Sequence, residues 1–201
     1  MNKLFINKHI KIKDYTVFVD GNADFSERTE HFATFAKSIY KNYNIKYSKF
    51  YKMDLLSKLG FLASELLLND SIQNFLPEET AVILANSSSS LNTDKKYQDT
   101  IAEHPSPSVF VYTLPNIVIG EICIRNTFRG ESLFLVQESF DTDFLTTYVA
   151  NLFAETNTKQ CIAGWVEMSL DENHHADLYL VSKNDSGKIF DKQNLDILFK
   201  T

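Results

Sequence analysis

The chain has 201 residues, 44% of them hydrophobic and 23% charged, with a formal net charge of −6 and an isoelectric point near 5.4. Such a length and composition suit one globular domain, here residues 1–201. The acidic balance and the scattered lysines and arginines argue against nucleic acid as a partner. No apolar run reaches the roughly 18–20 residues of a membrane helix, so we expect no membrane span.

The N-terminal segment and the two cysteines favour a cytoplasmic protein. The segment MNKLFINKHIKIKD contains lysines but no apolar h-region and no small-residue cleavage site, so it does not resemble a signal peptide. Cys123 and Cys161 both lie within apolar patterns, which predicts buried free thiols rather than a disulfide.

The first third of the chain predicts a strand followed by two helices. Residues 11–20 are rich in β-branched and aromatic side chains and end in an Asp-Gly turn. Ser26 then predicts the start of a helix, and Asp54 is a good N-cap for a second one. Apolar residues recur at helical spacing in both, at Phe32, Phe35, Ala36, Ile39 and Tyr40 and then at Leu55, Leu59, Leu62, Ala63, Leu66 and Leu67.

Residues 80–85 are apolar on both faces, which predicts a central strand covered by helices. Asn86 and four serines follow, and their position predicts a close-packed turn rather than a linker. The remaining patterns predict a helix from about Asn116, a strand at 133–137, a helix to about Ala154, strands at 161–166 and 177–181, and a helix at 191–199. This alternation indicates an α/β layered domain with a mixed sheet.

Residues 116–167 resemble the nucleophile region of the β-ketoacyl synthases. In that family an Asn-x-x-x-Gly helix leads through a Leu-Arg-Gly-Pro-Ser turn into a buried strand that ends at the active-site cysteine. A helix follows, and the next strand ends in Ala-Gly-Gly-x-Glu. The positions of this chain that match the pattern are Asn116, Gly120, Arg129, Gly130, Ser132, Ala163, Gly164 and Glu167. The same register puts Ser139 at the nucleophile position.

The resemblance extends over roughly residues 50–183, because residues 52–54 and 81–91 also look like family segments. It implies the N-terminal half of the thiolase-like fold, with a mixed, mostly parallel sheet of about five strands flanked by helices. Gly130 is expected to turn the chain into the buried strand, and Gly164 to let the next strand pack closely. Glu131 and Trp165 depart from the pattern, and we interpret Trp165 as a packing residue.

The resemblance does not imply the family's chemistry, so we expect no catalytic residue. A serine nucleophile needs an adjacent base, and none is evident for Ser139. Glu138 precedes it, where a carboxylate repels a developing oxyanion. We therefore interpret Ser139 as the N-cap of the helix that begins near Asp141. The sequence also ends about where the second half of a ketosynthase begins, so condensation by this chain alone is not expected.

No metal site or cofactor is expected either. The segment 171–177 contains His174 and His175 among acidic residues, and we interpret it as a solvated loop because a metal needs three or four converging ligands. His9, His31 and His104 have no companions in the sequence. No G-x-G-x-x-G, P-loop, G-x-S-x-G or H-E-x-x-H motif occurs.

Three functions remain open. The first is a non-catalytic ketosynthase-like protein, an accessory subunit in fatty acid or polyketide-type biosynthesis. The second is a module that binds an acyl chain or an acyl carrier protein, and the third is a serine acyltransferase or hydrolase that uses Ser139. We expect a homodimer, or a heterodimer with a full-length ketosynthase. The reason is that strand 133–136 and one helix face, Phe144, Leu145, Tyr148, Val149 and Leu152, are apolar throughout.

Overall fold

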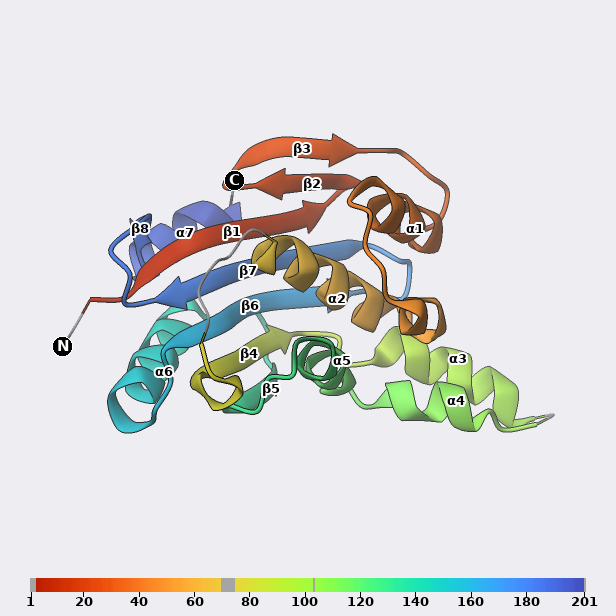
Figure 1. The fold of residues 1–201 in the computed structure, drawn as a ribbon. Coiled ribbons are helices and arrows are strands. Elements are labelled where there is room, and N and C mark those ends of the chain that lie inside the picture. Colours follow the sequence, from red (N-terminus) through yellow and green to blue (C-terminus); the bar gives the residue numbers. More distant parts are fainter. Residues whose placement is uncertain (1–2, 70–74, 103, 201) are drawn as a thin grey trace.

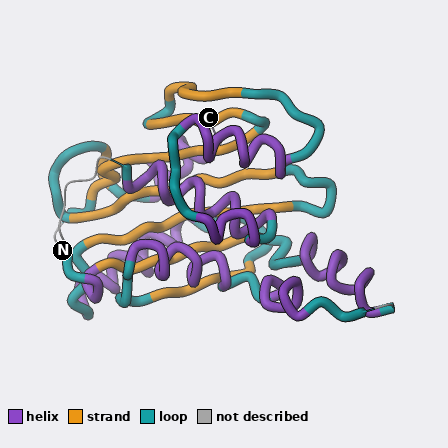
Figure 2. The backbone as a smooth tube through the Cα atoms, turned by 45° about the vertical axis from the view of Figure 1, so that its right-hand side comes forward, coloured by secondary structure: helices purple, strands orange, loops and turns teal. Residues whose placement is uncertain are grey.

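One mixed sheet runs through the computed structural model, which describes residues 3–69, 75–102 and 104–200, and helices cover both faces of that sheet (Figures 1 and 2). Its strands are β1 (Phe5–Lys13), β2 (Thr16–Val19), β3 (Asn22–Ser26), β4 (Thr80–Asn86), β5 (Ser132–Val136), β6 (Gln160–Met168), β7 (His174–Ser182) and β8 (Lys188–Ile189). The α/β architecture predicted from the sequence is confirmed.

The strands are ordered β3-β2-β1-β7-β6-β4-β5, and β8 pairs with Phe5 and Ile6 at the start of β1. Only β4 with β5 and β4 with β6 are parallel within the described sheet, and the other pairs are antiparallel. The sheet thus has eight strands instead of about five, and it is less parallel than expected. β4 is central and buried along its whole length, as its sequence predicts.

The extra strands come mainly from two tight turns near the N-terminus. Asp14 and Tyr15 both have positive φ angles, of 48° and 58°, and they fold the predicted strand 11–20 into the hairpin β1–β2. Asp20 and Gly21 form a second turn of this kind, as expected, and lead into β3. Ser26 ends β3 and therefore does not start a helix, so that prediction was wrong.

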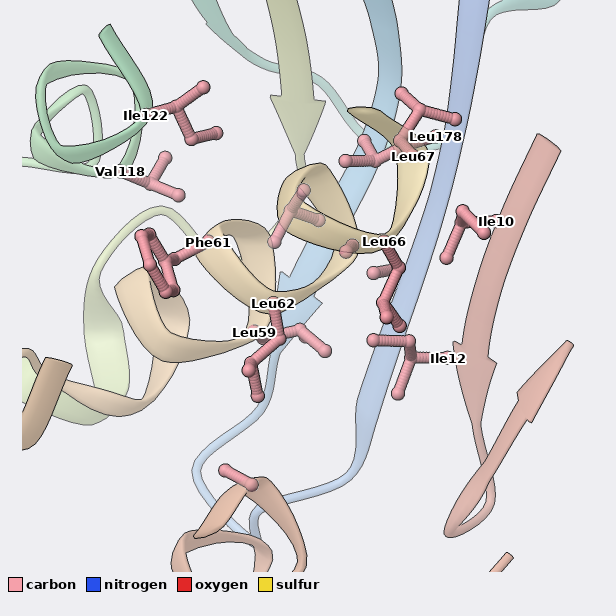
Figure 3. Close-up of a cluster of buried hydrophobic side chains, with 14 of the residues drawn as sticks. Ile10, Ile12, Leu59, Phe61, Leu62, Leu66, Leu67, Val118, Ile122 and Leu178 are labelled. Atoms are coloured by element: carbon pink, nitrogen blue, oxygen red, sulfur yellow. The ribbon is translucent and has the colours of Figure 1, made fainter. Parts of the chain in front are cut away.

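Two helices with strong apolar patterns cover one face of the sheet. They are α1 (Phe32–Asn42) and α2 (Leu55–Leu68), and α5 (Ile117–Asn126) lies beside α2. The carboxylate of Asp54 accepts a hydrogen bond from the Ser57 N–H and caps α2, as predicted. Because α2 lies among α1, α5 and the sheet, it is buried almost all round. Figure 3 shows Leu66 and Leu67 of α2 on the side of Ile10, Ile12 and Leu178 of the sheet.

The opposite face carries α6 (Thr142–Glu155) and α7 (Lys192–Lys200), which pack a second apolar cluster against the sheet. Leu145, Val149 and Leu152 are buried in it, so the chain's own sheet covers most of the apolar helix face on which the expected dimer partly rested. Phe144 and Tyr148 stack on each other with ring centroids 5.7 Å apart, and Phe144 keeps 38% of its surface exposed.

A small helical unit projects from the end of the sheet in Figure 1. It comprises α3 (Leu91–Ile101), α4 (Pro107–Phe110) and the 3-10 turn Val111–Thr113. Two further 3-10 turns, Ser48–Lys52 and Pro77–Glu79, lead into α2 and β4. No single helix in the described ranges is long and apolar enough to cross a membrane, although Pro107–Thr113 and Ile117–Asn126 together meet that test across a 99° bend.

Candidate functional site

The carboxyl ends of β4, β5 and β6 meet at one edge of the sheet. The Gln137 N–H donates to the carbonyl oxygen of Asn86 (2.8 Å), which joins the ends of β5 and β4. Across β4, the Glu167 carboxylate accepts from the Ser87 N–H (2.7 Å) and the Ser87 hydroxyl (2.6 Å). The serine run is therefore a tight turn held by Glu167, as its position in the sequence predicted.

Two of the three matched glycines occupy places that no side chain could share. A Cβ atom on Gly130 would lie 2.4 Å from the carbonyl oxygen of Thr80, and one on Gly164 would lie 2.0 Å from that of Asp177. Gly164 also has a φ of 153°, which L residues rarely adopt. The close packing expected at Gly164 is present, and Gly130, which was expected to turn the chain into β5, also lies against the backbone of β4. Gly120 differs, because nothing lies within 4 Å of a Cβ placed there.

The other matched residues do not converge. Asn116 precedes α5 without a side-chain capping bond. Arg129 is exposed, with a guanidinium nitrogen 3.9 Å from the carboxylate of Glu78. Ser132 opens β5 at the opposite end of that strand from Ser139, and Ala163 is buried in β6. Among the predicted positions, Ser139 and Glu167 lie just after or near the carboxyl ends of β5 and β6.

Ser139 lies in the turn between β5 and α6 and is exposed. It borders a cavity of about 370 Å³ that is lined by Gln137, Glu138, Phe140, Asp141, Thr142, Lys192 and Asp196. The N-cap of α6 is Asp141, whose carboxylate accepts from the Phe144 N–H (2.9 Å). The interpretation of Ser139 as the cap was therefore wrong. The helix begins at Thr142, close to the expected Asp141, but the cap is two residues later than Ser139, because the Asp141 carboxylate occupies the capping position.

The Ser139 hydroxyl has carboxylates rather than a bonded base around it. Within the described ranges no side chain makes a hydrogen bond to it. Glu138 and Asp141 flank it, and the nearby Asp196 accepts from the Thr142 hydroxyl (2.6 Å). These carboxylates disfavour a developing oxyanion, and Lys192 is the single basic side chain of the cavity lining.

Beneath the Ser139 turn the protein is filled by aromatic rings. Phe140 packs against Trp165, Tyr179 and Phe199, with ring centroids 5.7, 6.4 and 4.6 Å away. Trp165 is only 5% exposed, so it is a packing residue as interpreted from the sequence. The rings join the turn at Ser139 to α7, which supplies Phe199.

A buried charged cluster adjoins these rings, and the sequence did not reveal it. The Nε2 atom of His9 lies 2.6 Å from Asp177 Oδ1, and Lys11 Nζ and His175 Nε2 lie 3.2 and 3.4 Å from Asp177 Oδ2. Asp177 is completely buried, whereas His9 and Lys11 are 4% and 5% exposed. The view that His9 has no companions was wrong, and so was the assignment of residues 174–177 to a solvated loop.

The register of β1 against β7 creates this cluster. Lys11 pairs with Asp177 and His9 with Tyr179, so polar side chains that alternate along both strands face α7 together. Lys11 Nζ also donates to the Leu198 carbonyl oxygen (2.5 Å) at the end of α7. The one available signal was the alternation of His9 and Lys11 with isoleucines in β1.

The cluster keeps its carboxylate ionised. Burial alone raises the pKa of Asp177, but hydrogen bonds from His175 and His9 and the positive charge of Lys11 outweigh it and hold this pKa well below its usual range. Burial and the neighbouring Asp177 charge raise the pKa of Tyr179. A separate residue, His174, is buried against Phe32, and burial lowers its pKa.

No metal-binding group of three or more His, Cys, Asp or Glu side chains occurs among residues 3–69, 75–102 and 104–200. Cys123 and Cys161 are both free thiols. Cys161 is buried as expected, whereas Cys123 is only partly buried.

Comparison with known proteins shows that this chain is similar to solved structures in its fold. No family model and no curated protein matches the sequence. Among solved structures, the ishigamide ketosynthase/chain length factor matches 93% of this chain with a TM-score of 0.67 at 15% identity. A ketosynthase (ApeO) in complex with its chain length factor (ApeC) from Xenorhabdus doucetiae matches 92% with a TM-score of 0.59 at 13% identity, over 80% of the matched chain.

A third similar structure is a β-ketoacyl synthase from Burkholderia phymatum, which matches 90% of this chain and 59% of its own length, with a TM-score of 0.58 at 11% identity. The chain spans 64% of the length of the ishigamide protein. Identities this low establish the fold alone. The described chain therefore has the thiolase-like fold of ketosynthase and chain length factor chains, over less than two thirds of the length of the first of them.

Proposed function

We propose that this chain is a non-catalytic ketosynthase-like protein that acts as an accessory subunit of a ketosynthase in fatty acid or polyketide-type biosynthesis. The observation that carries the proposal is the state of Ser139 in this fold. By the register of the sequence resemblance Ser139 stands at the nucleophile position; it has no base bonded to it in the described chain and is flanked by carboxylates. Two of the similar structures are described as a ketosynthase together with a chain length factor.

The free edge of the sheet supports a role in pairing. β5 is the terminal strand of the described sheet, with β4 on one side only. The Gln137 N–H and the Glu131 carbonyl oxygen form hydrogen bonds with β4. Because successive residues of a strand direct their backbone N–H and C=O groups to opposite sides, those of Ser132, Phe134 and Val136 point away from β4. Val136 is 56% exposed, and an apolar strand edge of this kind is a template for another chain.

The partner that we propose is a full-length ketosynthase, with a second copy of this chain as the alternative. Sedimentation of the purified chain, alone and mixed with a ketosynthase from the same organism, distinguishes these cases. We expect Val136→Lys to weaken the association at least tenfold, because a lysine on an edge strand opposes strand pairing. Leu170→Lys is the matched control, since Leu170 is 50% exposed in the turn between β6 and β7, neither of which pairs with β5.

The result that contradicts pairing through β5 is also clear. One such result is that the chain sediments near 23 kDa at micromolar concentration both with and without the ketosynthase. The other is that both lysine variants weaken the association equally. In parallel, the chain alone should release no carbon dioxide from malonyl-carrier protein above background. A turnover of about 1 s⁻¹, the order of many enzymes, would refute the non-catalytic assignment.

A group of lysines favours a second candidate function, the binding of an acidic carrier protein. Burial lowers the pKa of Lys58, the charge of Asp54 opposes this shift, and the charges of Lys96 and Lys37 lower the pKa further. Lys58 also donates to the carbonyl oxygen of Met53, beside the exposed Lys52. Carrier-protein binding that falls with added salt, and falls further in Lys37→Gln/Lys96→Gln, supports this function.

A further inference from the structure

Two strained turns meet at one buried histidine. Asp14 and Tyr15 form the β1–β2 turn with φ angles of 48° and 58°, and Glu172 has a φ of 60° in the turn between β6 and β7. Residues other than glycine rarely adopt such angles, so the surrounding structure must hold them in place. His174, which is 6% exposed at the start of β7, is bonded to both turns.

The hydrogen bonds of His174 fix its protonation state. The Tyr15 N–H donates to Nε2 (3.2 Å), and because a backbone N–H can only donate, Nε2 carries a lone pair. Nδ1 lies 3.2 Å from the carbonyl oxygen of Glu172, which can only accept, so Nδ1 carries the proton. The ring is therefore neutral in this structure, and both of its nitrogens have a partner.

His174 also contacts the start of α1. The ring centroids of Phe32, Tyr15 and Phe35 lie 4.7, 4.8 and 5.8 Å from that of the imidazole. The Glu172 carboxylate accepts from the Phe32 N–H (2.9 Å) and so fastens the first turn of α1 to the turn between β6 and β7. His174 thus joins three segments that are distant in the sequence: the β1–β2 turn, the start of α1 and the β6–β7 turn.

The groups around His174 act on its charge in opposite directions. Burial lowers its pKa most, the hydrogen bond to the Glu172 carbonyl and the charges of Asp14 and Glu172 raise it, and His175 lowers it again. On the side of α1, His31 Nδ1 lies 3.8 Å from the Glu172 carboxylate. Since the net shift is downward from the ordinary pKa of about 6.5, an opened segment takes up a proton before the closed one does. Opening therefore becomes easier as the pH falls below about 6.5.

We propose that His174 is a pH-sensitive switch, whose neutral ring holds the β1–β2 turn against α1 and whose protonation by solvent releases both. A proton on Nε2 makes this atom a donor, so it repels the Tyr15 N–H instead of accepting from it. The strained turn then loses a contact that holds it, and the start of α1 loses its support on the imidazole ring. β5 lies at the opposite edge of the sheet from the β2–β3 hairpin, so the switch is independent of the proposed pairing with a ketosynthase.

Amide hydrogen exchange of the full chain, followed by NMR between pH 7.5 and pH 5.5, tests the switch. The protection factor divides the intrinsic exchange rate of an amide by its measured rate, which removes the ordinary effect of pH. We expect the protection factors of Tyr15 and Phe32 to fall about tenfold over this range, because each opening takes up one proton. The Phe144 amide, bonded to Asp141 on the other face of the sheet, should keep its value. Constant protection at Tyr15 and Phe32, or an equal fall at Phe144, would overturn the proposal.

Two histidine variants identify the group that titrates. His174→Gln takes up no proton in this range, so the fall in protection at Tyr15 and Phe32 should disappear, whereas the matched control His31→Gln should leave it unchanged. A fall that persists in His174→Gln, or that vanishes in His31→Gln, would contradict the assignment to His174. If His174→Gln fails to fold, the imidazole ¹⁵N shifts of His174 in the unmodified chain decide. A proton on Nδ1 at pH 7.5 is expected, and a proton on Nε2 would refute the switch.

Discussion

A Cβ atom on Gly164 would lie 2.0 Å from the carbonyl oxygen of Asp177, on the neighbouring strand. This contact joins a residue of the predicted sequence pattern to the buried charged cluster. Gly164 in β6 pairs with Leu178 in β7, so a side chain at Gly164 would push apart the two strands that hold the centre of the sheet.

Gly164→Ala should therefore be strongly destabilising, by about 4 kcal/mol or more, because it adds a backbone clash to a φ angle that alanine rarely adopts. Gly120→Ala is the matched control. Gly120 lies inside α5 with open space around it, so alanine should stabilise the chain by about 0.5–1 kcal/mol. Urea unfolding followed by the fluorescence of Trp165, the only tryptophan, measures both effects. Equal effects of the two substitutions would contradict the close approach at Gly164.

Asp177 should make the stability of the protein depend on acid pH. Its pKa in the folded state is lowered, so the ionised carboxylate stabilises the fold fully above the unfolded-state pKa of about 3.9. That contribution is lost progressively as pH falls from about 5 toward the folded-state pKa. Asp177→Asn removes one partner of a buried pair and should cost about 3–5 kcal/mol near pH 7.

Urea unfolding of both proteins between pH 7 and pH 2 checks this expectation. The difference in the free energy of unfolding between the wild type and Asp177→Asn should shrink as the pH falls below about 5. A difference that stays constant over this range would mean that the carboxylate contributes nothing through its ionisation.

The sequence predicted best those elements that are most completely buried. β4 and α2 are apolar on nearly every side, and their sequences predicted both type and position. The hairpin β1–β2 was missed because Asp14 and Tyr15 adopt positive φ angles without the glycine that usually marks such a turn. Local sequence therefore gave no sign that the predicted strand 11–20 folds back on itself.

The candidate site was less predictable, because its parts meet only through the sheet. His9 and Asp177 are 168 positions apart and become neighbours through the register of β1 with β7. No short motif encodes such a pair. The Ser139 turn was placed correctly after β5, but the choice between Ser139 and Asp141 as the cap depends on where α6 begins, and helix ends are not fixed by periodicity.

The capping assignment in the structure gives a direct stability test. Asp141→Ala should cost about 1 kcal/mol, because the Phe144 N–H loses its acceptor at the N-terminus of α6. Ser139→Ala should change the free energy of unfolding by less than about 0.5 kcal/mol, as expected for an exposed side chain without bonds in the described chain. Chemical denaturation of the two variants side by side measures both. A larger cost for Ser139→Ala would return the capping role to Ser139.

The thiol of Ser139→Cys should behave as an ordinary exposed cysteine. A helix N-terminus lowers a thiol pKa when its N–H groups face the sulfur, but Asp141 occupies the cap of α6, and Glu138 adds a second negative charge. The pKa of the new thiol should thus lie at or above about 8.5, with only a few per cent thiolate at pH 7. The native cysteines interfere little, since burial raises the pKa of both Cys123 and Cys161.

The rate of iodoacetamide labelling as a function of pH gives this pKa, with Ser186→Cys as the control, because Ser186 is exposed in a loop away from helix ends. Similar profiles for the two variants are expected. An apparent pKa near 6–7 for Ser139→Cys alone would show that the turn still activates a nucleophile. Activation of this kind would favour acyl transfer over the accessory role, because the position would keep the electrostatics that the chemistry requires.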